Sequence, residues 1–268
     1  KNIILSIGYL ANHFRNYYGD GSEFRVKISY VEDKFPNGTG GALRQCQSLL
    51  NEHFLLINGD TIFDINYHDL AKTFNKKKIG HLALNFVKES KSYVEVKTRD
   101  NIVISFSDKK GINSGYINSG VYIFNRKILD YIPTGNSSLE KDIFQKLLNK
   151  KLLSAKKYNS FFLDIGISLS LKDAQEIIPR WKRKSALLLD RDGVINIDYG
   201  FVHSMDNFKY VEGAKEIIKM ANDLGILVIV ITNQSGIARG YYTENEFHLF
   251  TEEINEDLKN FGAHIDAT

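Results

Sequence analysis

The stretch Phe54-Leu55-Leu56-Ile57-Asn58-Gly59-Asp60 places a carboxylate shortly after four apolar residues. The same pattern returns in Phe161-Phe162-Leu163-Asp164-Ile165-Gly166 and, with two carboxylates, in Leu187-Leu188-Leu189-Asp190-Arg191-Asp192-Gly193. Short continuous apolar runs that end at turn residues predict buried strands. In α/β folds, ligands bind outside the carboxyl ends of such strands, which makes these acidic residues candidates for functional sites.

Outward from these runs, strand-like and helix-like segments alternate, which predicts an α/β fold. The expected strands are 2–7, 26–31, 54–57, 82–87, 102–106, 116–124, 161–165, 186–189 and 226–231. The expected helices are 9–18, 39–50, 138–149, 213–224 and 243–261. The basic segment 179–184 interrupts the alternation, and we interpret it as a solvated linker rather than an anion-binding patch. We therefore expect two domains, 1–180 and 185–268.

The composition narrows the class of protein. Lys and Arg number 35 against 32 Asp and Glu, and a net charge of +3 does not by itself indicate a nucleic-acid partner. The single Cys46 excludes an internal disulfide framework and a Cys-rich zinc site, and its place on an apolar stripe predicts a small buried side chain. No apolar run approaches the ~20 residues of a membrane span.

No signal peptide is visible either. We expect a cytoplasmic enzyme with no membrane or nucleic-acid partner, for which a homo-oligomer remains open. The chain begins without Met inside an apolar run and stops just after another apolar element. We therefore also expect further residues at both ends.

Asp190 and Asp192 have the spacing of a catalytic pair. Strand alternation predicts that both side chains point to one side, and two close carboxylates favour a cation between them. Mg²⁺ is the expected ion because it prefers oxygen ligands. One carboxylate could then attack phosphorus while the other moves a proton. A second apolar run, 228–231, leads into Thr232, whose hydroxyl could bind a phosphoryl oxygen.

The strings DRDGVIN (190–196) and TNQSGIARG (232–240) together resemble the haloacid dehalogenase superfamily of phosphatases. Within it, they resemble the branch of heptose-bisphosphate and histidinol-phosphate phosphatases. The resemblance implies that Asp190 is the nucleophile, and that Asp192 is the general acid/base and offers its backbone carbonyl to Mg²⁺. It also implies that Thr232 and Asn233 hold the transferring phosphate.

Some parts of that family pattern do not occur before Thr268. These parts are a later Lys or Arg, a final acidic metal ligand, and the Cys/His zinc loop of the heptose branch. The resemblance therefore assigns a Zn²⁺ site only to residues beyond Thr268.

The first part of the chain carries a glycine cluster and two separate acidic residues. Gly38-Thr39-Gly40-Gly41 opens an expected helix, where glycines leave N–H groups free and let a ligand approach closely. The alternative to a ligand-binding role for these glycines is a tight loop before a buried helix. Asp60 and Asp164 could converge on one Mg²⁺ that is bound to a nucleotide, or each could cap a strand-to-helix turn.

The strings GTGGALRQ, FLLINGD, SFSDKK, YINSGVYIF, SLEKDIF and FFLDIG resemble the sugar-1-phosphate nucleotidyltransferase family, and most of all its heptose- and mannose-1-phosphate guanylyltransferases. The resemblance covers residues 1–178 and implies a Rossmann-like mixed sheet, followed by a partial parallel α/β domain of the dehalogenase type. It implies Mg²⁺ on Asp60 and Asp164. The implied nucleotide contacts are Gly38, Thr39, Gly40 and Gly41, and the implied sugar-phosphate contacts are Lys109, Asn118, Gly120, Glu140 and Lys141.

Two of these residues have competing interpretations. Lys109 also fits a solvated turn, and Ser137-x-x-Glu140 is also a capping box.

The family's glycine-rich N-terminal signature would precede Lys1. A Tyr-Gly pair that is usual before Val94-Glu95 is absent, so the sequence at 88–95 looks interrupted.

The two resemblances correspond to consecutive steps in the activation of one sugar. The link between them is an argument from analogy. A phosphatase would remove the 7-phosphate of heptose 1,7-bisphosphate, and a nucleotidyltransferase would couple the remaining 1-phosphate to GTP, giving GDP-heptose and pyrophosphate. The leading hypothesis is a bifunctional enzyme that makes nucleotide-activated heptose for a bacterial surface glycan. One alternative is another sugar 1-phosphate (mannose, glucose or an N-acetyl sugar) with a histidinol-phosphatase-like second domain. The other is a degenerate, non-catalytic binding protein.

Overall fold

The computed structural model describes the chain except residues 34, 89–92, 108–112 and 167, and it divides into two compact units. The first unit comprises Lys1–Ile57 and Asn75–Lys156, and the second comprises Asn58–Phe74 and Lys157–Thr268. Segments 58–74 and 157–180 of the expected first domain therefore pack with residues 185–268. The domain limits expected from the sequence differ from these units and stay a prediction.

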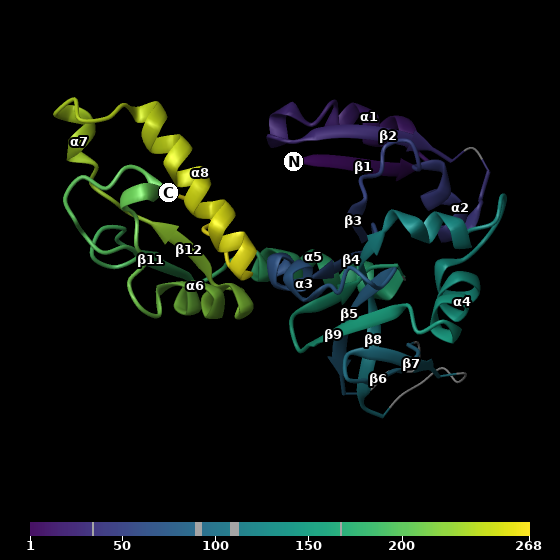
Figure 1. Cartoon of the computed structure of the whole chain (residues 1–268). Helices are drawn as coiled ribbons and strands as arrows, with labels where there is room; N and C mark the ends of the chain where they lie inside the picture. Colours follow the sequence, from purple (N-terminus) through teal and green to yellow (C-terminus); the bar gives the residue numbers. More distant parts are fainter. Residues whose placement is uncertain (34, 89–92, 108–112, 167) are drawn as a thin grey trace. The chain divides into compact units, whose positions relative to one another are not determined.

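The first unit begins with β1 (Asn2–Ile7) and β2 (Lys27–Glu32), which pair in parallel. Between them lie α1 (Ala11–Tyr18) and the 3-10 turn η1 (Ser22–Phe24), and α2 (Gly38–Gln45) follows. The larger sheet has six strands in the order β3-β8-β5-β9-β7-β6 (Figure 1). Their bounds are β3 His53–Ile57, β5 Gly80–Val87, β6 Val96–Arg99, β7 Ile102–Phe106, β8 Gly115–Asn125 and β9 Leu153–Tyr158.

The core of the first unit forms around β8, which is antiparallel to both β3 and β5. Tyr122 and Phe124 of this strand stack with ring centroids 5.3 Å apart, and both are fully buried. Phe144 packs against them from the helical segment that contains the π-helical turn η3 (Leu139–Ile143) and α4 (Phe144–Asn149). The 3-10 turn η2 (Arg126–Tyr131) adds Ile128 to this core. Cys46 is buried there, as expected from its apolar stripe.

The strand that follows α2 is less buried than the sequence indicates. Leu55 and Ile57 of β3 are 44% and 45% exposed, although a continuous apolar run predicts burial on both faces. The prediction is wrong for these two side chains, because only Phe54 and Leu56 pack against the core, and strand alternation puts Leu55 and Ile57 on the opposite face.

The second unit contains two short sheets and most of the helices. β4 (Thr61–Phe63) pairs antiparallel with β10 (Phe162–Asp164), and β11 (Ala186–Leu189) pairs in parallel with β12 (Leu227–Val230). The helices are α3 Tyr67–Thr73, α5 Ser168–Trp181, α6 Ala214–Asp223, α7 Ser235–Ala238 and α8 Glu244–Phe261, and the 3-10 turn η4 covers Met205–Asn207. Helices α6 and α8 lie beside β12 (Figure 1). Their buried side chains, such as Ile218, Leu258 and Val228, form one core. The expected α/β class is confirmed.

Helix α8 begins and ends as its sequence predicts. The Thr243 hydroxyl accepts from the Glu246 N–H at 3.2 Å, and a Glu246 carboxylate oxygen accepts from the Thr243 N–H at 2.7 Å. This reciprocal pair is a capping box. At the other end Gly262 takes a left-handed conformation with φ of 89°, which glycine adopts at low cost.

Helix α5 continues through Pro179 to Trp181, so the segment 179–184 is not wholly a linker. Pro179 lies in the last turn, so its missing N–H and its ring disturb the hydrogen bonding of the final turn only. The Trp181 indole N–H donates to Asp64 Oδ2 at 2.9 Å, and the Lys184 ammonium binds the same carboxylate. The prediction of a solvated connection is wrong at Trp181 and Lys184, because Asp64 binds both.

Candidate functional site

Asp60 and Asp164 lie side by side at the β4–β10 pair of the second unit. Asp164 is paired with Thr61 in the strand register, and the Ile165 N–H donates to the Asp60 carbonyl at 2.8 Å. A methyl group placed on Gly166 would lie 2.8 Å from Asp60 Oδ2 and 3.1 Å from Asp164 Oδ1. Asp60 is exposed and Asp164 half-buried, so the two carboxylates form an acidic pair at a solvent-facing position.

The glycine cluster of the first unit packs tightly against the loop 135–138. A side chain at Gly38 would come within 2.4 Å of the Ser137 carbonyl, and one at Gly41 within 2.7 Å of the Gly135 carbonyl. The Gly40 N–H donates to Ser137 O at 2.8 Å. The expectation of a free N–H is wrong for Gly40, because the neighbouring loop accepts its hydrogen bond. Nucleotide contacts at Gly38–Gly41 stay a prediction.

Thr39 connects this cluster to Glu140. The Thr39 hydroxyl donates to Glu140 Oε2 at 3.0 Å and accepts from the Leu139 N–H at 2.9 Å. The Ser138 hydroxyl donates to the same carboxylate oxygen at 2.9 Å. Glu140 is thereby held in one orientation, and Thr39 has a structural role that its sequence position does not reveal.

The helical segment at 139–149 starts one residue later than the sequence predicts. Ser138 is the N-cap, and its hydroxyl accepts from the Lys141 N–H at 3.2 Å. The prediction of a capping box at Ser137-x-x-Glu140 is therefore wrong, because the N-cap is Ser138 and the Glu140 carboxylate accepts a hydrogen bond from Thr39 instead. Lys141 is exposed in this first turn.

Asn118 and Gly120 lie on β8 next to Tyr122. The Asn118 amide donates to the Tyr122 hydroxyl at 2.7 Å, and its Oδ1 accepts from the Gly120 N–H at 3.2 Å. Burial, and then the Glu140 carboxylate, raises the pKa of Tyr122. The structure therefore links Asn118 and Glu140 through Tyr122, which the sequence analysis did not single out. Lys109 lies outside the described residues.

Asp190 and Asp192 follow β11 in the second unit. The strand ends at Leu189, so strand alternation does not set the directions of their side chains. Asp190 is exposed, and its Oδ1 accepts from the Arg191 N–H at 2.7 Å. Asp192 is half-buried and forms an ion pair with the Arg191 guanidinium at 2.9 Å. The Asn196 amide donates to Asp192 Oδ1 at 3.0 Å.

Gln234 connects Asp192 to Thr232. Its amide donates to Asp192 Oδ2 at 3.1 Å and to the Thr232 hydroxyl at 2.7 Å. The Tyr242 hydroxyl in turn donates to Gln234 Oε1 at 2.6 Å. Burial raises the pKa of Tyr242, Arg191 opposes that effect, and Asp192 adds to it. Asn233 is exposed.

Arg191, Gln234 and Tyr242 were not predicted from the sequence as functional residues. Arg191 is buried at 3% exposure, and its guanidinium also donates to the Val202 carbonyl at 2.6 Å. A basic residue between two acidic ones, and an amide directly after the proposed phosphate ligands, were the available signals. The contact with Tyr242 depends on tertiary structure and leaves no local pattern.

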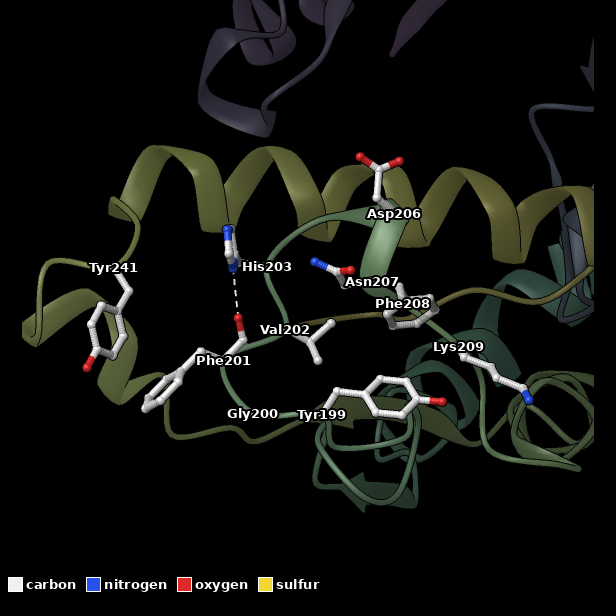
Figure 2. Close-up of a pocket in the computed structure, with 10 residues that line it drawn as sticks. All are labelled: Tyr199, Gly200, Phe201, Val202, His203, Asp206, Asn207, Phe208, Lys209 and Tyr241. Carbon is white, nitrogen blue, oxygen red and sulfur yellow. Dashed lines mark hydrogen bonds between the residues drawn. The ribbon is translucent and has the colours of Figure 1, made fainter.

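A cavity of about 850 Å³ lies beside this network, between the loop 199–209 and Tyr241. Figure 2 shows Phe201 and Tyr241 at one end and Lys209 at the other. The Phe201 and Tyr241 rings meet edge to face at 4.7 Å. His203 Nδ1 donates to the Phe201 carbonyl at 2.7 Å, and the His203 ring stacks on Tyr242 at 4.8 Å. A chain of contacts therefore runs from this cavity through Tyr242 and Gln234 to Asp192.

The donor atoms at the two acidic pairs suit a hard cation. Within the described ranges, no cluster of three or more His, Cys, Asp or Glu side chains could hold a metal ion. Asp60 and Asp164 instead offer two neighbouring carboxylates, and Asp190 offers one exposed carboxylate. Mg²⁺ commonly binds to one or two carboxylates together with waters and substrate phosphates. In the described part of the chain, no helix has the length and apolar character that a membrane crossing needs.

Comparison with known proteins assigns the fold. The family model described as "Nucleotidyl transferase" matches residues 1–180. The chain belongs to the nucleotidyl transferase family. The matched range contains the glycine cluster, Glu140 and the acidic pair of Asp60 and Asp164, so these residues belong to the nucleotidyl transferase part of the chain.

A curated relative and a solved structure resemble this nucleotidyl transferase part. The D-glycero-alpha-D-manno-heptose 1-phosphate guanylyltransferase of Aneurinibacillus thermoaerophilus is 36% identical over 184 residues, 65% of this chain and 76% of the relative. The crystal structure of HddC from Yersinia pseudotuberculosis has a TM-score of 0.59 at 27% identity, covering 66% of this chain and 78% of that one. The same HddC protein has been solved in complex with GMP-PN.

A second group of relatives are phosphatases. The D-glycero-beta-D-manno-heptose-1,7-bisphosphate 7-phosphatase of Haemophilus ducreyi is 45% identical over 85 residues, 31% of this chain. The match covers 47% of that phosphatase, so the chain spans slightly less than half of its length. The recognition of both families from sequence is confirmed.

Proposed function

We propose that this protein catalyses two reactions of heptose activation. The first transfers GMP from GTP to D-glycero-D-manno-heptose 1-phosphate and releases pyrophosphate. The second removes the 7-phosphate of heptose 1,7-bisphosphate. The observation that carries the proposal is the presence of two separate acidic pairs, Asp60 with Asp164 and Asp190 with Asp192, in a chain with relatives of both kinds.

In the first reaction, an oxygen of the sugar 1-phosphate attacks the α-phosphorus of GTP. The new P–O bond forms as the bond to the β-phosphate breaks, and pyrophosphate leaves. Asp60 and Asp164 would hold Mg²⁺, which would offset the phosphate charge. Glu140 is held by Thr39 and Ser138 and accepts hydrogen bonds from sugar hydroxyls, and Asn118 and Lys141 contact the sugar phosphate. Gly38–Gly41 contact the nucleotide.

In the second reaction, the exposed carboxylate of Asp190 attacks the 7-phosphorus and forms an aspartyl-phosphate. Asp192 gives a proton to the departing sugar oxygen, and then takes one from the water that hydrolyses the aspartyl-phosphate. Thr232 and Asn233 hold the phosphoryl oxygens, and Asp190 and the backbone carbonyl of Asp192 would hold Mg²⁺. Arg191, Asn196 and Gln234 all donate hydrogen bonds to the Asp192 carboxylate. Asp192 must therefore break some of these hydrogen bonds, and form them again, in each catalytic cycle.

The cavity that is linked to Asp192 through His203, Tyr242 and Gln234 supports a sugar phosphate as the second substrate. Its volume of about 850 Å³ lies within the usual range of small-molecule sites. The aromatic rings of Phe201 and Tyr241 offer an apolar surface to the C–H face of a sugar, and Lys209 offers a charge to a second phosphate.

The proposal also concerns the location of the reactions and the metal ions. We place the reactions in the cytoplasm, where nucleoside triphosphates are available. We assign no residue here to Zn²⁺, because the chain has only one cysteine, Cys46, and it is buried. A homo-oligomer stays a prediction.

A pyrophosphate assay tests the first reaction. The full-length protein is incubated with Mg²⁺, heptose 1-phosphate and each nucleoside triphosphate in turn. We expect release of pyrophosphate, fastest with GTP. Mannose, glucose and N-acetyl sugar 1-phosphates are the competing substrates, and turnover with none of these sugars would reject the nucleotidyl transfer.

Phosphate release from heptose 1,7-bisphosphate tests the second reaction. Asp190→Asn removes the nucleophilic oxygen and should abolish release, while nucleotidyl transfer by the same variant continues. An Asp190→Asn protein that still releases phosphate would show that another residue is the nucleophile. Histidinol phosphate is the competing substrate.

A further inference from the structure

The acidic pair of the nucleotidyl transferase part shares a compact unit with the phosphatase-like residues 185–268. Asp60 and Asp164 belong to segments 58–74 and 157–184, which pack with residues 185–268 in the second unit. The contacts are concentrated on one short helix, α3, which begins shortly after Asp60. The polar atoms at this contact therefore decide how firmly the two parts are joined.

Asn66 bridges the two parts with both ends of its side-chain amide. Its Oδ1 accepts from the N–H groups of His68 and Asp69 at 3.1 and 3.2 Å, and so caps α3. Its Nδ2 donates to Asp223 Oδ1 at 2.9 Å and to the Gly262 carbonyl at 2.8 Å. Asn66 is only 3% exposed, and a buried amide that loses its partners is destabilising.

A buried charge lies one turn along the same helix. Asp69 is 4% exposed and forms an ion pair with Lys219 of α6 at 2.8 Å. Lys219 also binds Asp223 at 2.5 Å, so one ammonium joins two carboxylates from the two parts. A buried carboxylate without its cation is strongly destabilising, which makes Lys219 the cation that this contact requires.

The C-terminal end of α8 completes the contact. The Lys72 ammonium donates to the Phe261 carbonyl at 2.6 Å and lies 4.3 Å from the centre of the Phe261 ring. A side chain at Gly262 would come within 3.5 Å of Asp69 Cα, so the two backbones approach closely. Lys72 and Asn66 thus satisfy carbonyl groups that the end of α8 leaves open.

Both strands of the acidic pair lead directly into this contact. β4 starts at Thr61, next to Asp60, and ends three residues before Asn66. β10 ends at Asp164 and follows Tyr158, whose hydroxyl donates to Asp69 Oδ2 at 3.3 Å. A displacement of α3 would therefore move both segments that carry the carboxylates.

We propose that docking of α3 on the phosphatase-like residues positions Asp60 and Asp164, so that the phosphatase-like part is needed for full nucleotidyl transfer. Asn66, Asp69 and Lys219 are positioning residues in this arrangement, because they act through α3. That the pair binds Mg²⁺ rests on the proposed function, whereas the docking itself does not. By thermodynamic reciprocity, the coupling also works in the opposite direction.

Amide hydrogen exchange of the full-length protein tests the docking. The Asp64 N–H donates to Phe161 O at 2.9 Å, and the Ile165 N–H donates to Asp60 O at 2.8 Å, so both amides report on the acidic pair. In Lys219→Met we expect these amides to exchange about tenfold faster or more. Lys219→Arg keeps the charge and should restore slow exchange.

Lys215→Met is the matched control. Lys215 lies one turn earlier on α6, and its 2.5 Å ion pair with Asp257 joins two phosphatase-like residues. We expect the amides of Asp64 and Ile165 to keep their exchange rates in this variant. Equal exchange in Lys219→Met and Lys215→Met would overturn the proposal.

The Mg²⁺ dependence of pyrophosphate release provides the second readout. The Mg²⁺ concentration for half-maximal rate should rise about threefold or more in Lys219→Met and stay unchanged in Lys215→Met. An unchanged concentration in Lys219→Met would also overturn the positioning role. If the unmodified protein releases no pyrophosphate, the proposed function fails, and the exchange measurement still decides the docking.

Lys72→Ala covers the case in which Lys219→Met does not fold. It removes one partially exposed contact to Phe261, so a folded protein is expected. The same amides should exchange faster by a smaller factor, about threefold. Exchange as slow as in the unmodified protein would overturn the proposal.

Discussion

Gly166 lies against both carboxylates of the first acidic pair. A methyl group there would lie 2.8 Å from Asp60 Oδ2, which is too close for unbonded atoms, and the exposed Asp60 side chain would rotate away. We expect Gly166→Ala to lower the rate of pyrophosphate release about tenfold or more, because metal ligands displaced by ~1 Å position the reactants poorly.

Gly59→Ala is the control for this change. Gly59 precedes Asp60, and a methyl group on it would meet nothing within 4 Å. Nucleotidyl transfer should survive in this variant, and phosphate release should survive in both variants. Equal loss of nucleotidyl transfer in the two variants would contradict a specific role of the pair.

Tyr242 acts on Asp192 through Gln234. Tyr242→Phe keeps the ring that stacks on His203 but removes the hydroxyl that donates to Gln234 Oε1 at 2.6 Å. We expect the kcat of phosphate release to fall about tenfold with little change in KM, because Gln234 then orients Asp192 less firmly. Pyrophosphate release by the same protein is the internal control, and a loss of both activities would indicate general damage instead.

At the scale of single elements, α8 depends on its N-terminal cap. Thr243→Ala removes the hydroxyl that accepts from the Glu246 N–H and should lower the free energy of unfolding by about 1 kcal/mol. Chemical denaturation measures this change. Thr251→Ala, on the same helix, removes only a hydroxyl that donates to the Phe247 carbonyl, and it should change stability less. A larger loss in Thr251→Ala would contradict the importance of the cap.

Elements with strong local signals could be predicted from the sequence. The cap of α8, the strand Ala186–Leu189 and the helix at 213–224 each follow from patterns within a few residues. Helix α3 was not anticipated, because its seven residues give too short an apolar pattern and its cap binds distant groups. Helix α5 was also missed as a whole, and its last residue, Trp181, binds Asp64, which is far away in sequence.

At the scale of the whole molecule, acidic residues at strand ends could be recognised, but their surroundings could not. The proximity of Asp60 to Asp164 was expected from their shared sequence pattern, and it agrees with the structure. The partners of Asp192 were not expected, because Gln234 and Tyr242 reach it through folding of distant segments. The packing of residues 58–74 with residues 185–268 was not anticipated, because contacts such as Asn66 with Asp223 and Asp69 with Lys219 leave no pattern along the chain.

The same buried contact predicts a loss of stability at alkaline pH. Burial, and then the Asp69 carboxylate, raises the pKa of Tyr158 above its ordinary 10.0. Burial lowers the pKa of Lys219, but its hydrogen bonds to Asp223 and Asp69 outweigh burial and raise the pKa above 10.5. Both raised values mean that the folded protein keeps protons that the unfolded chain releases. The stabilisation is therefore complete below about pH 10 and is lost as the pH rises through the folded-state values.

Denaturation of the full-length protein between pH 8 and pH 11 measures this effect. The free energy of unfolding should fall above about pH 10, by up to about 1.4 kcal/mol per pH unit for each proton that only the folded state keeps. Tyr158→Phe removes one such proton and should make the fall less steep, and Tyr17→Phe, at an exposed tyrosine, is the control. A slope that is the same in Tyr158→Phe as in the unmodified protein would show that Tyr158 ionises without cost to the contact with Asp69. In that case α3 would be held mainly by Asn66 and Lys219.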